Sequence, residues 1–439
     1  MNTTCRAIAC ALLLLTASRT AQAVPEYIQT EQTSRGSVTE SVESTEHAFT
    51  PRPRLRIFPR LHDAFVRGSM DVQLRNYYFQ RNHDTDPNRE AWAQGGEISY
   101  RTSSWKNRLD MGATLFTSQK LYGPSDKDGT NLLKPGQKSY TVLGEAYIEA
   151  RLFGDLTVKA YRQRFNLPYL NGFDTRMTPN TFEAVTLGDS GGKRFVYILS
   201  QTWGIKKQNA TNFVSMTEAA GIDGPDRAMS SAGMRYTFDN GANIGLINHY
   251  TKDFINIFYS EANSRIRPWR DVGLQFSAQY TRQHAIGDQL GDNFDARVWG
   301  AKVAASRGGL ILSLARTSTA NNADIRSDWG GDPSYISIIV ENFNRAGEDA
   351  WLVGLSSDFR HFGDSGFSAF INYARGDTPD RGRAASPDQS EFDLTLDYKP
   401  KHGQLKGLWF RLRGAFVNRD DNSDFRDIRL IANYDFSPL

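Results

Sequence analysis

Apolar and polar side chains alternate from Met70 to Arg81, in the sequence MDVQLRNYYFQR. Successive side chains of a β-strand point to opposite faces, so this alternation predicts a strand with one apolar face and one charged, aromatic face. The apolar face would meet a second sheet in a soluble sandwich. In a membrane barrel it would meet lipid, and the charged face would line a polar interior.

Similar runs recur along the rest of the chain. We count about eighteen of them, each of about 8–14 residues, and a strand that crosses a membrane needs roughly 9–11. Their length therefore suits a membrane barrel. We predict strands over 70–81, 92–104, 106–118, 139–152, 154–165, 181–188, 193–206, 229–239, 241–250, 253–263, 271–283, 293–305, 308–317, 350–360, 365–376, 389–399, 406–418 and 425–436.

The connections between these runs alternate between long and short, with the link near Lys252 as an exception. The long links cover 83–91, 119–138, 166–180, 207–228, 318–349 and 377–388. An up-and-down barrel with long extracellular loops and short periplasmic turns produces this alternation. We therefore predict an all-β fold, a transmembrane antiparallel barrel of about 18 strands whose lumen conducts or has to be filled.

The first 23 residues predict export. They combine the basic residue Arg6, an apolar run over 7–16 and a cleavage site at Ala21-Gln22-Ala23, as a secretory signal peptide does. Cys5 and Cys10, the two cysteines of the chain, lie inside this segment, so the exported chain would have no disulfide or thiol chemistry. Residues 24–69 are rich in Ser, Thr and Glu and then in Pro and Arg. They predict a mostly disordered periplasmic tail or a partial plug, followed by the barrel domain over 70–439.

Charge and composition narrow the function further. The chain has 52 basic and 49 acidic residues, and removal of Arg6 and Arg19 with the signal peptide leaves 50 and 49. This near-neutral balance argues against nucleic-acid binding. No stretch after the signal peptide approaches the roughly 18 apolar residues of a helical membrane span. An aromatic content of 12% suits an outer-membrane barrel, and it also suits an exported β-rich enzyme.

The polar faces of the strands suggest what the lumen would handle. Four arginines share the lumen face on the first strand and the last two strands, which are neighbours in a closed barrel: Arg75, Arg411, Arg413 and Arg429. Guanidinium groups stay charged and bind carboxylates through two hydrogen bonds, so a track of them would pass anionic solutes along several weak sites. Arg235 and Arg297 would extend the track. Inward-facing acids such as Asp393 and Asp427 leave open the alternative that the arginines only pair with carboxylates.

The link from Asn166 to Ala184 is the best candidate for a pore constriction. Its Pro and Gly residues favour a fixed, turn-rich shape, although an ordinary surface loop is also compatible with them. The side chains that would narrow the pore are Tyr169, Phe173, Asp174, Arg176 and Phe182. The link over 318–349, which contains Trp329 and Tyr335, is a second candidate for folding inward.

Signals for an enzyme or a metal site are weak. None of the seven histidines has the spacing of metal ligands. The acidic run over 420–424 could hold calcium, but we interpret it as a solvated loop. We therefore expect no cofactor and no covalent step.

Several segments together resemble the OprD-type substrate-specific outer-membrane porins. The segments are RNYYF at 75–79, AWAQG at 91–95, DTRMTPNTF at 174–182, LKGL at 405–408 and RLIANY at 429–434. The resemblance runs from about Asp63 to Leu439. It implies an 18-stranded monomeric barrel, narrowed by its third and seventh long loops, with an arginine ladder best matched by Arg411, Arg413 and Arg429. The tail before Asp63 is longer than the family pattern, and the third loop differs in detail.

The resemblance also implies a function. Small carboxylate-bearing solutes, such as amino acids or aromatic acids, would diffuse passively through the barrel in the bacterial outer membrane. The expected partners are these solutes, outer-membrane lipid and the barrel-assembly machinery, without nucleic acid, and the expected state is a monomer or a weakly associated oligomer. A plugged binding protein or adhesin, and a barrel hydrolase such as a phospholipase or protease, remain the alternatives.

Overall fold

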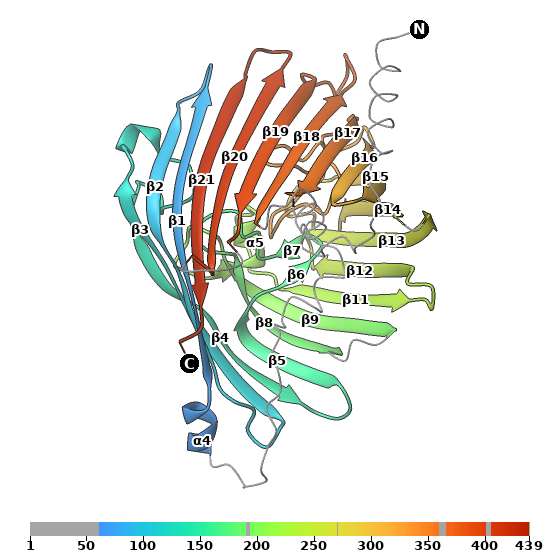
Figure 1. Ribbon diagram of the computed structural model, residues 1–439. Helices are drawn as coiled ribbons and strands as arrows, with labels where there is room; N and C mark the ends of the chain where they lie inside the picture. Colours follow the sequence, from blue (N-terminus) through green and yellow to red (C-terminus); the bar gives the residue numbers. More distant parts are fainter. Residues whose placement is uncertain (1–60, 190–193, 270, 360–365, 401–404, 439) are drawn as a thin grey trace.

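Eighteen antiparallel strands close into a single barrel (Figure 1). The computed structural model describes residues 61–189, 194–269, 271–359, 366–400 and 405–438. The barrel strands are β1 (Ser69–His83), β2 (Arg89–Arg101), β3 (Leu109–Tyr122), β4 (Tyr140–Arg151), β5 (Leu156–Gln163), β8 (Thr181–Asp189), β9 (Phe195–Lys206), β11 (Met229–Thr237), β12 (Asn243–Thr251), β13 (Ile255–Trp269), β14 (Val272–Ala285), β15 (Asp295–Arg307), β16 (Leu310–Thr319), β17 (Asp349–Asp358), β18 (Phe367–Asp377), β19 (Gln389–Tyr398), β20 (Leu408–Arg419) and β21 (Phe425–Phe436).

Each barrel strand pairs with the next one along the chain, and the last pairs with the first. β1 and β21 run side by side from Val72 opposite Phe436 to His83 opposite Phe425. Closure leaves no open sheet edge, so the backbone hydrogen bonds of every barrel strand have partners on both sides. The predicted fold class is confirmed, and each predicted run corresponds to one strand. Among the described residues, no helix is long and apolar enough to cross a membrane.

The alternation of side chains along each strand separates an apolar outer face from a polar inner face. On β14, Phe276 and Tyr280 point outward and are about 40% exposed, whereas Ser277 and Gln279 point inward and are buried. Outward apolar side chains of this kind form the lipid-facing surface of a membrane barrel.

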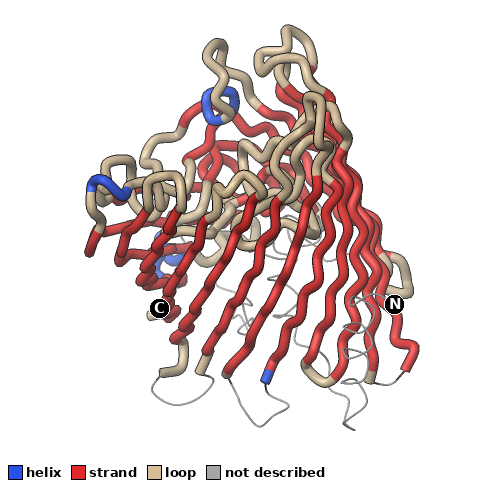
Figure 2. The backbone as a smooth tube through the Cα atoms, turned by 90° about the horizontal axis from the view of Figure 1, so that it is seen from above, coloured by secondary structure: helices blue, strands red, loops and turns tan. Residues whose placement is uncertain are grey.

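The long loops gather over one end of the strands, here called the loop end, and the short turns lie at the opposite turn end (Figure 2). The loops contain the short elements η2 (Ser125–Lys127), β6 (Asn166–Leu167), β7 (Leu170–Asn171), β10 (Val214–Ser215) and α5 (Met216–Ala219). We call residues 164–180 the third loop, 207–228 the fourth loop and 320–348 the seventh loop.

The largest buried apolar cluster lies inside the barrel. Leu167 and Tyr169 of the third loop, Met216 of the fourth and Trp329 of the seventh pack together with inward side chains of β8 to β15. Trp329 also donates a hydrogen bond from its indole Nε1 to the carbonyl of Met216, at 2.8 Å. The inward-folded loops therefore fill the lumen on the side of β8 to β15.

Helix α4 (Leu61–Val66) precedes β1 and packs at the turn end (Figure 1). The carbonyl of Ala64 accepts hydrogen bonds from the backbone N–H and the hydroxyl of Ser103, in the turn between β2 and β3, at 2.9 and 3.2 Å. The end of the predicted tail is thus held on the barrel rim. The predicted signal peptide and the rest of the tail lie outside the described residues.

Candidate functional site

Within the described residues, two cavities that share lining residues lie inside the barrel. The larger has a volume of about 1300 Å³ and extends to the turn end, and the smaller has about 180 Å³ and lies toward the loop end. Four residues line both cavities: Phe173, Thr175, Arg176 and Ile339. The first three belong to the third loop and the last to the seventh. We call the place where the two cavities meet, between these two loops, the constriction.

The two cavities differ in charge. Ten basic and eight acidic residues line the larger one: Arg75, Arg101, Lys159, Arg164, Arg176, Arg265, Arg267, Lys302, Arg411 and Arg413, and Asp71, Glu97, Glu145, Glu149, Asp174, Asp189, Glu261 and Asp393. The lining of the smaller one contains three arginines, Arg81, Arg176 and Arg429, and among the described residues no carboxylate. An anion entering from the loop end therefore meets three guanidinium groups before the constriction.

Four of the six arginines of the predicted track face the lumen from three adjacent strands. Arg413 of β20 lies directly opposite Arg429 of β21. Arg411 precedes Arg413 on the same face of β20, and Arg75 faces inward on the neighbouring strand β1. Barrel closure brings these residues together although β1 ends at His83 and β20 begins only at Leu408.

Carboxylates on the strands hold two of these arginines in place. Asp397 of β19 accepts two hydrogen bonds from Arg411, both at 2.7 Å. Asp427 pairs with Arg429 at 2.6 Å and also with Arg81. The alternative that lumen arginines pair with acids therefore holds for Arg411 and Arg429, and these pairs fix the position and orientation of each guanidinium group.

The predictions for Arg297 and Arg235 need correction. Arg297 lies on the outer face of β15 together with Trp299 and pairs with Asp295 at 2.5 Å. The prediction failed because Val298, on the inner face, packs against the buried loop cluster. Both faces of β15 are therefore apolar, and polarity cannot distinguish them. Arg235 does face inward, but it lies on β11 and lines neither cavity.

Only part of the predicted constriction set lines the passage. Phe173, Asp174 and Arg176 do so. Tyr169 is 1% exposed, and its hydroxyl is 2.8 Å from that of Thr281 on β14. Phe182 is fully buried against the ring of Phe165. Tyr169 and Phe182 therefore anchor the third loop to the barrel wall, and their prediction as pore-narrowing side chains is wrong.

An ion pair between Arg75 and Asp174 ties the third loop to β1. The two guanidinium NH groups of Arg75 lie 2.7 and 3.1 Å from the carboxylate oxygens of Asp174, and Arg75 also donates to the carbonyl of Arg176 at 2.6 Å. Burial alone would raise the pKa of the Asp174 carboxyl, but Arg75 and the nearby Arg164 outweigh this effect and hold the pKa below 3.8. Asp174 is thus ionised at neutral pH, and its side chain is still 42% exposed to the lumen.

Positive charge concentrates on the loop-end side of the constriction. The guanidinium groups of Arg176 and Arg429 lie 5.0 and 4.7 Å from the centre of the Phe79 ring, in cation–π contact. Burial of Arg176, together with the neighbouring Arg429, lowers its pKa to about 9. In the part of the chain that the structure describes, the buried Nε of Arg429 has no hydrogen-bond partner. An anion bound here would satisfy this donor and offset the repulsion between the two arginines.

Carboxylates of β19 fix the tip of the seventh loop. Glu391 accepts hydrogen bonds from the backbone N–H groups of Val340 and Glu341, at 2.9 and 2.7 Å, and Asp393 accepts one from Ile339 at 3.0 Å. The sequence analysis missed Glu391. Its position two residues before Asp393, on the same strand face, was the available signal.

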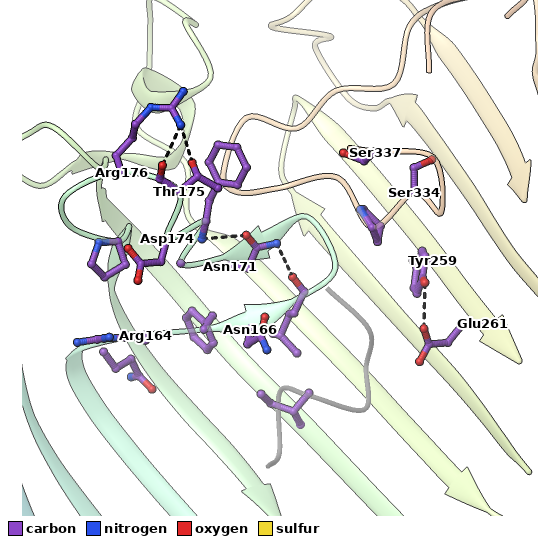
Figure 3. Close-up of a pocket in the computed structure, with 18 of the residues that line it drawn as sticks. Arg164, Asn166, Asn171, Asp174, Thr175, Arg176, Tyr259, Glu261, Ser334 and Ser337 are labelled. Carbon is purple, nitrogen blue, oxygen red and sulfur yellow. Dashed lines mark hydrogen bonds between the residues drawn. The ribbon is translucent and has the colours of Figure 1, made fainter. Parts of the chain in front are cut away.

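Asn171 connects the third loop to the seventh. Its side-chain amide donates to the carbonyl of Leu167 at 3.2 Å, within the third loop (Figure 3), and to the carbonyl of Gly331, in the seventh loop, at 3.0 Å. Its side-chain oxygen accepts from the backbone N–H groups of Phe173 and Gly331, at 3.2 and 2.7 Å. The sequence analysis also missed this residue, because only the folded loops bring its partners together.

We expect Asn171→Ala to loosen the constriction. The substitution removes four hydrogen bonds, each worth about 1 kcal/mol net. The single-channel conductance in a planar bilayer should rise by about half, with more current noise, because loops that narrow the pore set its resistance. Asn166→Ala is the matched control, since among the described residues the side chain of Asn166 lines the same cavity without a hydrogen bond. Identical traces from the two variants would contradict the linking role.

Comparisons with known proteins agree with this geometry. The family model for "outer membrane porin, OprD family" matches residues 63–438. Porin D of Pseudomonas aeruginosa is 24% identical over 408 residues, which cover 84% of this chain and 91% of that protein. The crystal structure of OccK9 (OpdG) from P. aeruginosa superimposes with a TM-score of 0.77 at 22% identity, covering 85% of this chain and 99% of that one.

Two further crystal structures have a similar fold. A BenF-like porin from Pseudomonas fluorescens Pf-5 has a TM-score of 0.77 at 20% identity, covering 85% of this chain and all of the other. OpdK of P. aeruginosa, crystallised with vanillate, has a TM-score of 0.75 at 20% identity, with 85% and 99% covered. These structural matches establish the fold, and the family model covers most of the chain. The chain belongs to the OprD family of outer-membrane porins.

Proposed function

We propose that this porin lets small carboxylate-bearing solutes, such as amino acids, aromatic acids or other organic acids, diffuse passively across the outer membrane. The observation that carries the proposal is the smaller cavity on the extracellular side of the constriction, where Arg81, Arg176 and Arg429 converge. Guanidinium groups recognise carboxylates through two parallel hydrogen bonds, and such a cluster attracts small organic anions.

Arg75, Arg411, Arg413 and Arg429, here called the arginine wall, continue this path through the constriction. Arg176 lines both cavities, and Arg413 lies opposite Arg429 on the next strand and lines the larger cavity. A carboxylate can therefore exchange one guanidinium group for the next. Several weak sites in series allow passage, whereas one tight site would retain the solute.

The size and composition of the passage favour small solutes. The extracellular-side cavity of about 180 Å³ has room for several water molecules, each of which takes about 30 Å³ in the liquid. Phe173 and Ile339 supply apolar surface at the narrow point, which suits an aromatic or aliphatic body behind the carboxylate. OpdK, which shares this fold, was crystallised with vanillate, an aromatic carboxylate.

We expect the double variant Arg411→Ala with Arg413→Ala to slow benzoate entry into proteoliposomes severalfold. The change removes two guanidinium groups from the wall, and it leaves Asp397 without Arg411, which adds repulsion toward anions. Entry of benzamide, which is uncharged and of similar size, should not change. The measurement is the initial rate of uptake into vesicles that contain equal amounts of folded porin.

The control is the double variant Arg265→Ala with Arg267→Ala. It also removes two arginines two residues apart on one strand, and both line the same cavity, but on β13 away from the arginine wall. Unchanged benzoate entry in the Arg411/Arg413 variant would contradict the proposal. An equal loss in the Arg265/Arg267 variant would show that only the total positive charge of the cavity matters.

A further inference from the structure

An aromatic residue between two arginines lies on the outer surface of the barrel near its extracellular end. Arg316 of β16 is directly opposite Trp351 of β17, which in turn is directly opposite Arg375 of β18. These adjacent strands lie at the upper right of Figure 1. All three side chains share the outward face of their strands with apolar residues such as Leu314 and Val353. We call this set the outer arginine clamp.

The outer arginine clamp lies at the upper border of the lipid-facing band. One step closer to the membrane centre, Leu314, Val353 and Tyr373 are exposed on the same face. The rings of Trp351 and Tyr373 lie 5.4 Å apart, an arrangement typical of the aromatic girdle at a membrane interface. An arginine on the lipid face is strongly unfavourable at the bilayer centre but is tolerated near the interface. The clamp is thus at the level of the lipid headgroups.

The spacing of the two arginines matches a specific kind of headgroup. Neighbouring strands are about 4.8 Å apart, so the backbones at Arg316 and Arg375, two strands apart, are separated by about 10 Å. In the described residues Arg316 forms no ion pair. Arg375 pairs with Asp377 at 2.8 Å and with Asp388 at 3.6 Å, and its side chain remains 43% exposed. A disaccharide with a phosphate at each end would place its phosphates on the two guanidinium groups and a sugar ring over the exposed indole of Trp351.

The neighbouring strands add positive charge at the same border. Arg282 of β14 and Arg297 of β15 are directly opposite each other, and both pair with Asp295. On β15 and β18, the aspartate that pairs with the arginine lies two residues farther from the membrane centre. The arginines are therefore the charged groups closest to the phosphate layer of the outer leaflet.

We infer that the outer arginine clamp binds the bis-phosphorylated disaccharide headgroup of an outer-leaflet glycolipid. This inference does not depend on which solute the lumen carries. The site lies on the outside of the barrel wall, opposite in direction to the arginines that line the lumen.

The test is native mass spectrometry of the full folded chain in detergent, titrated with a hexa-acylated glucosamine disaccharide that carries two phosphates. We expect saturable binding of this lipid and about tenfold weaker binding to the double variant Arg316→Gln with Arg375→Gln, the loss expected when about 1.4 kcal/mol of interaction is removed. Trp351→Leu should also weaken binding. The matched control is Arg426→Gln, because Arg426 is an exposed outward arginine at the extracellular end of β21 without this flanking pattern.

Three results would overturn the inference. One is unchanged binding in the Arg316/Arg375 variant, and another is an equal loss in the Arg426 variant. The third is equal binding of phosphatidylglycerol or of the monophosphorylated glycolipid, since either would show that the spacing of the two arginines is irrelevant. Inorganic phosphate should not compete at equal concentration. A difference in gel mobility between unheated and boiled samples of each variant verifies that the barrel is folded.

Discussion

Replacing Asp174 with asparagine should strengthen the binding of small carboxylates in the pore about tenfold, which corresponds to about 1.4 kcal/mol. The carboxylate of Asp174 occupies both NH groups of Arg75, yet it is itself 42% exposed to the lumen. Asp174 therefore competes with any passing carboxylate for the NH groups of Arg75. Asparagine keeps the shape of the side chain but removes its charge, and a charge-assisted hydrogen bond is worth about 1.5–3 kcal/mol.

The measurement is the concentration of benzoate that half-blocks the single-channel current. The pKa of Asp174 lies below 3.8, so this group remains ionised between about pH 5 and 8. The half-blocking benzoate concentration of the wild-type protein should therefore stay constant over this range. The matched control is Glu149→Gln, which removes a negative charge from the same cavity near the turn end. Equal strengthening by both substitutions would reveal a general charge effect rather than competition for Arg75.

Replacing Glu391 with leucine should release the tip of the seventh loop and widen the pore. Leucine is similar in size but cannot accept the hydrogen bonds that Val340 and Glu341 donate to Glu391. Each unsatisfied backbone N–H costs about 1–3 kcal/mol, so the attachment of the loop to β19 weakens to the single hydrogen bond from Ile339 to Asp393. We expect the single-channel conductance to about double and the discrimination between benzoate and benzamide to weaken, because the constriction provides both.

The control for this prediction is Glu149→Leu, the same substitution at another wall position of the larger cavity. It should leave conductance and discrimination close to the wild-type values. If Glu391→Leu also leaves them unchanged while the barrel is folded, the seventh loop does not need its attachment to β19 to narrow the pore.

The barrel itself could be predicted from the sequence because its two signals are local. Side-chain alternation along runs such as 70–81 marks each strand, and the alternation of long and short links marks the direction of each one. β13 extends six residues beyond its predicted end, to Trp269, because Ser264, Arg265 and Arg267 interrupt the apolar pattern on which the prediction rests.

The candidate site could be predicted only where the inward face of the strands is polar. On β1, β20 and β21 the inward face is polar, so side-chain alternation correctly placed Arg75, Arg413 and Arg429 on the lumen side. On β15 the inward face packs against apolar loop residues, so alternation wrongly placed Arg297 on the lumen side. No local pattern reports that a distant loop fills part of the lumen.

The loop residues show the same limit. Composition marked the third loop as ordered, but it could not separate Asp174, which lines the passage, from Tyr169, which packs against β13 and β14. Glu391 and Asn171 depend on contacts between segments about 50 and 160 residues apart. Such long-range hydrogen bonds leave no trace in the periodicity of either segment.

The central claim, that the arginine-lined passage selects carboxylates, is tested most directly by single-channel recording of the refolded wild-type protein with benzoate and then with benzamide. The two solutes have nearly the same size and aromatic body and differ in the carboxylate. We predict small discrete current steps that benzoate interrupts and benzamide does not. Steps that respond equally to both solutes, or to neither, would contradict the claim.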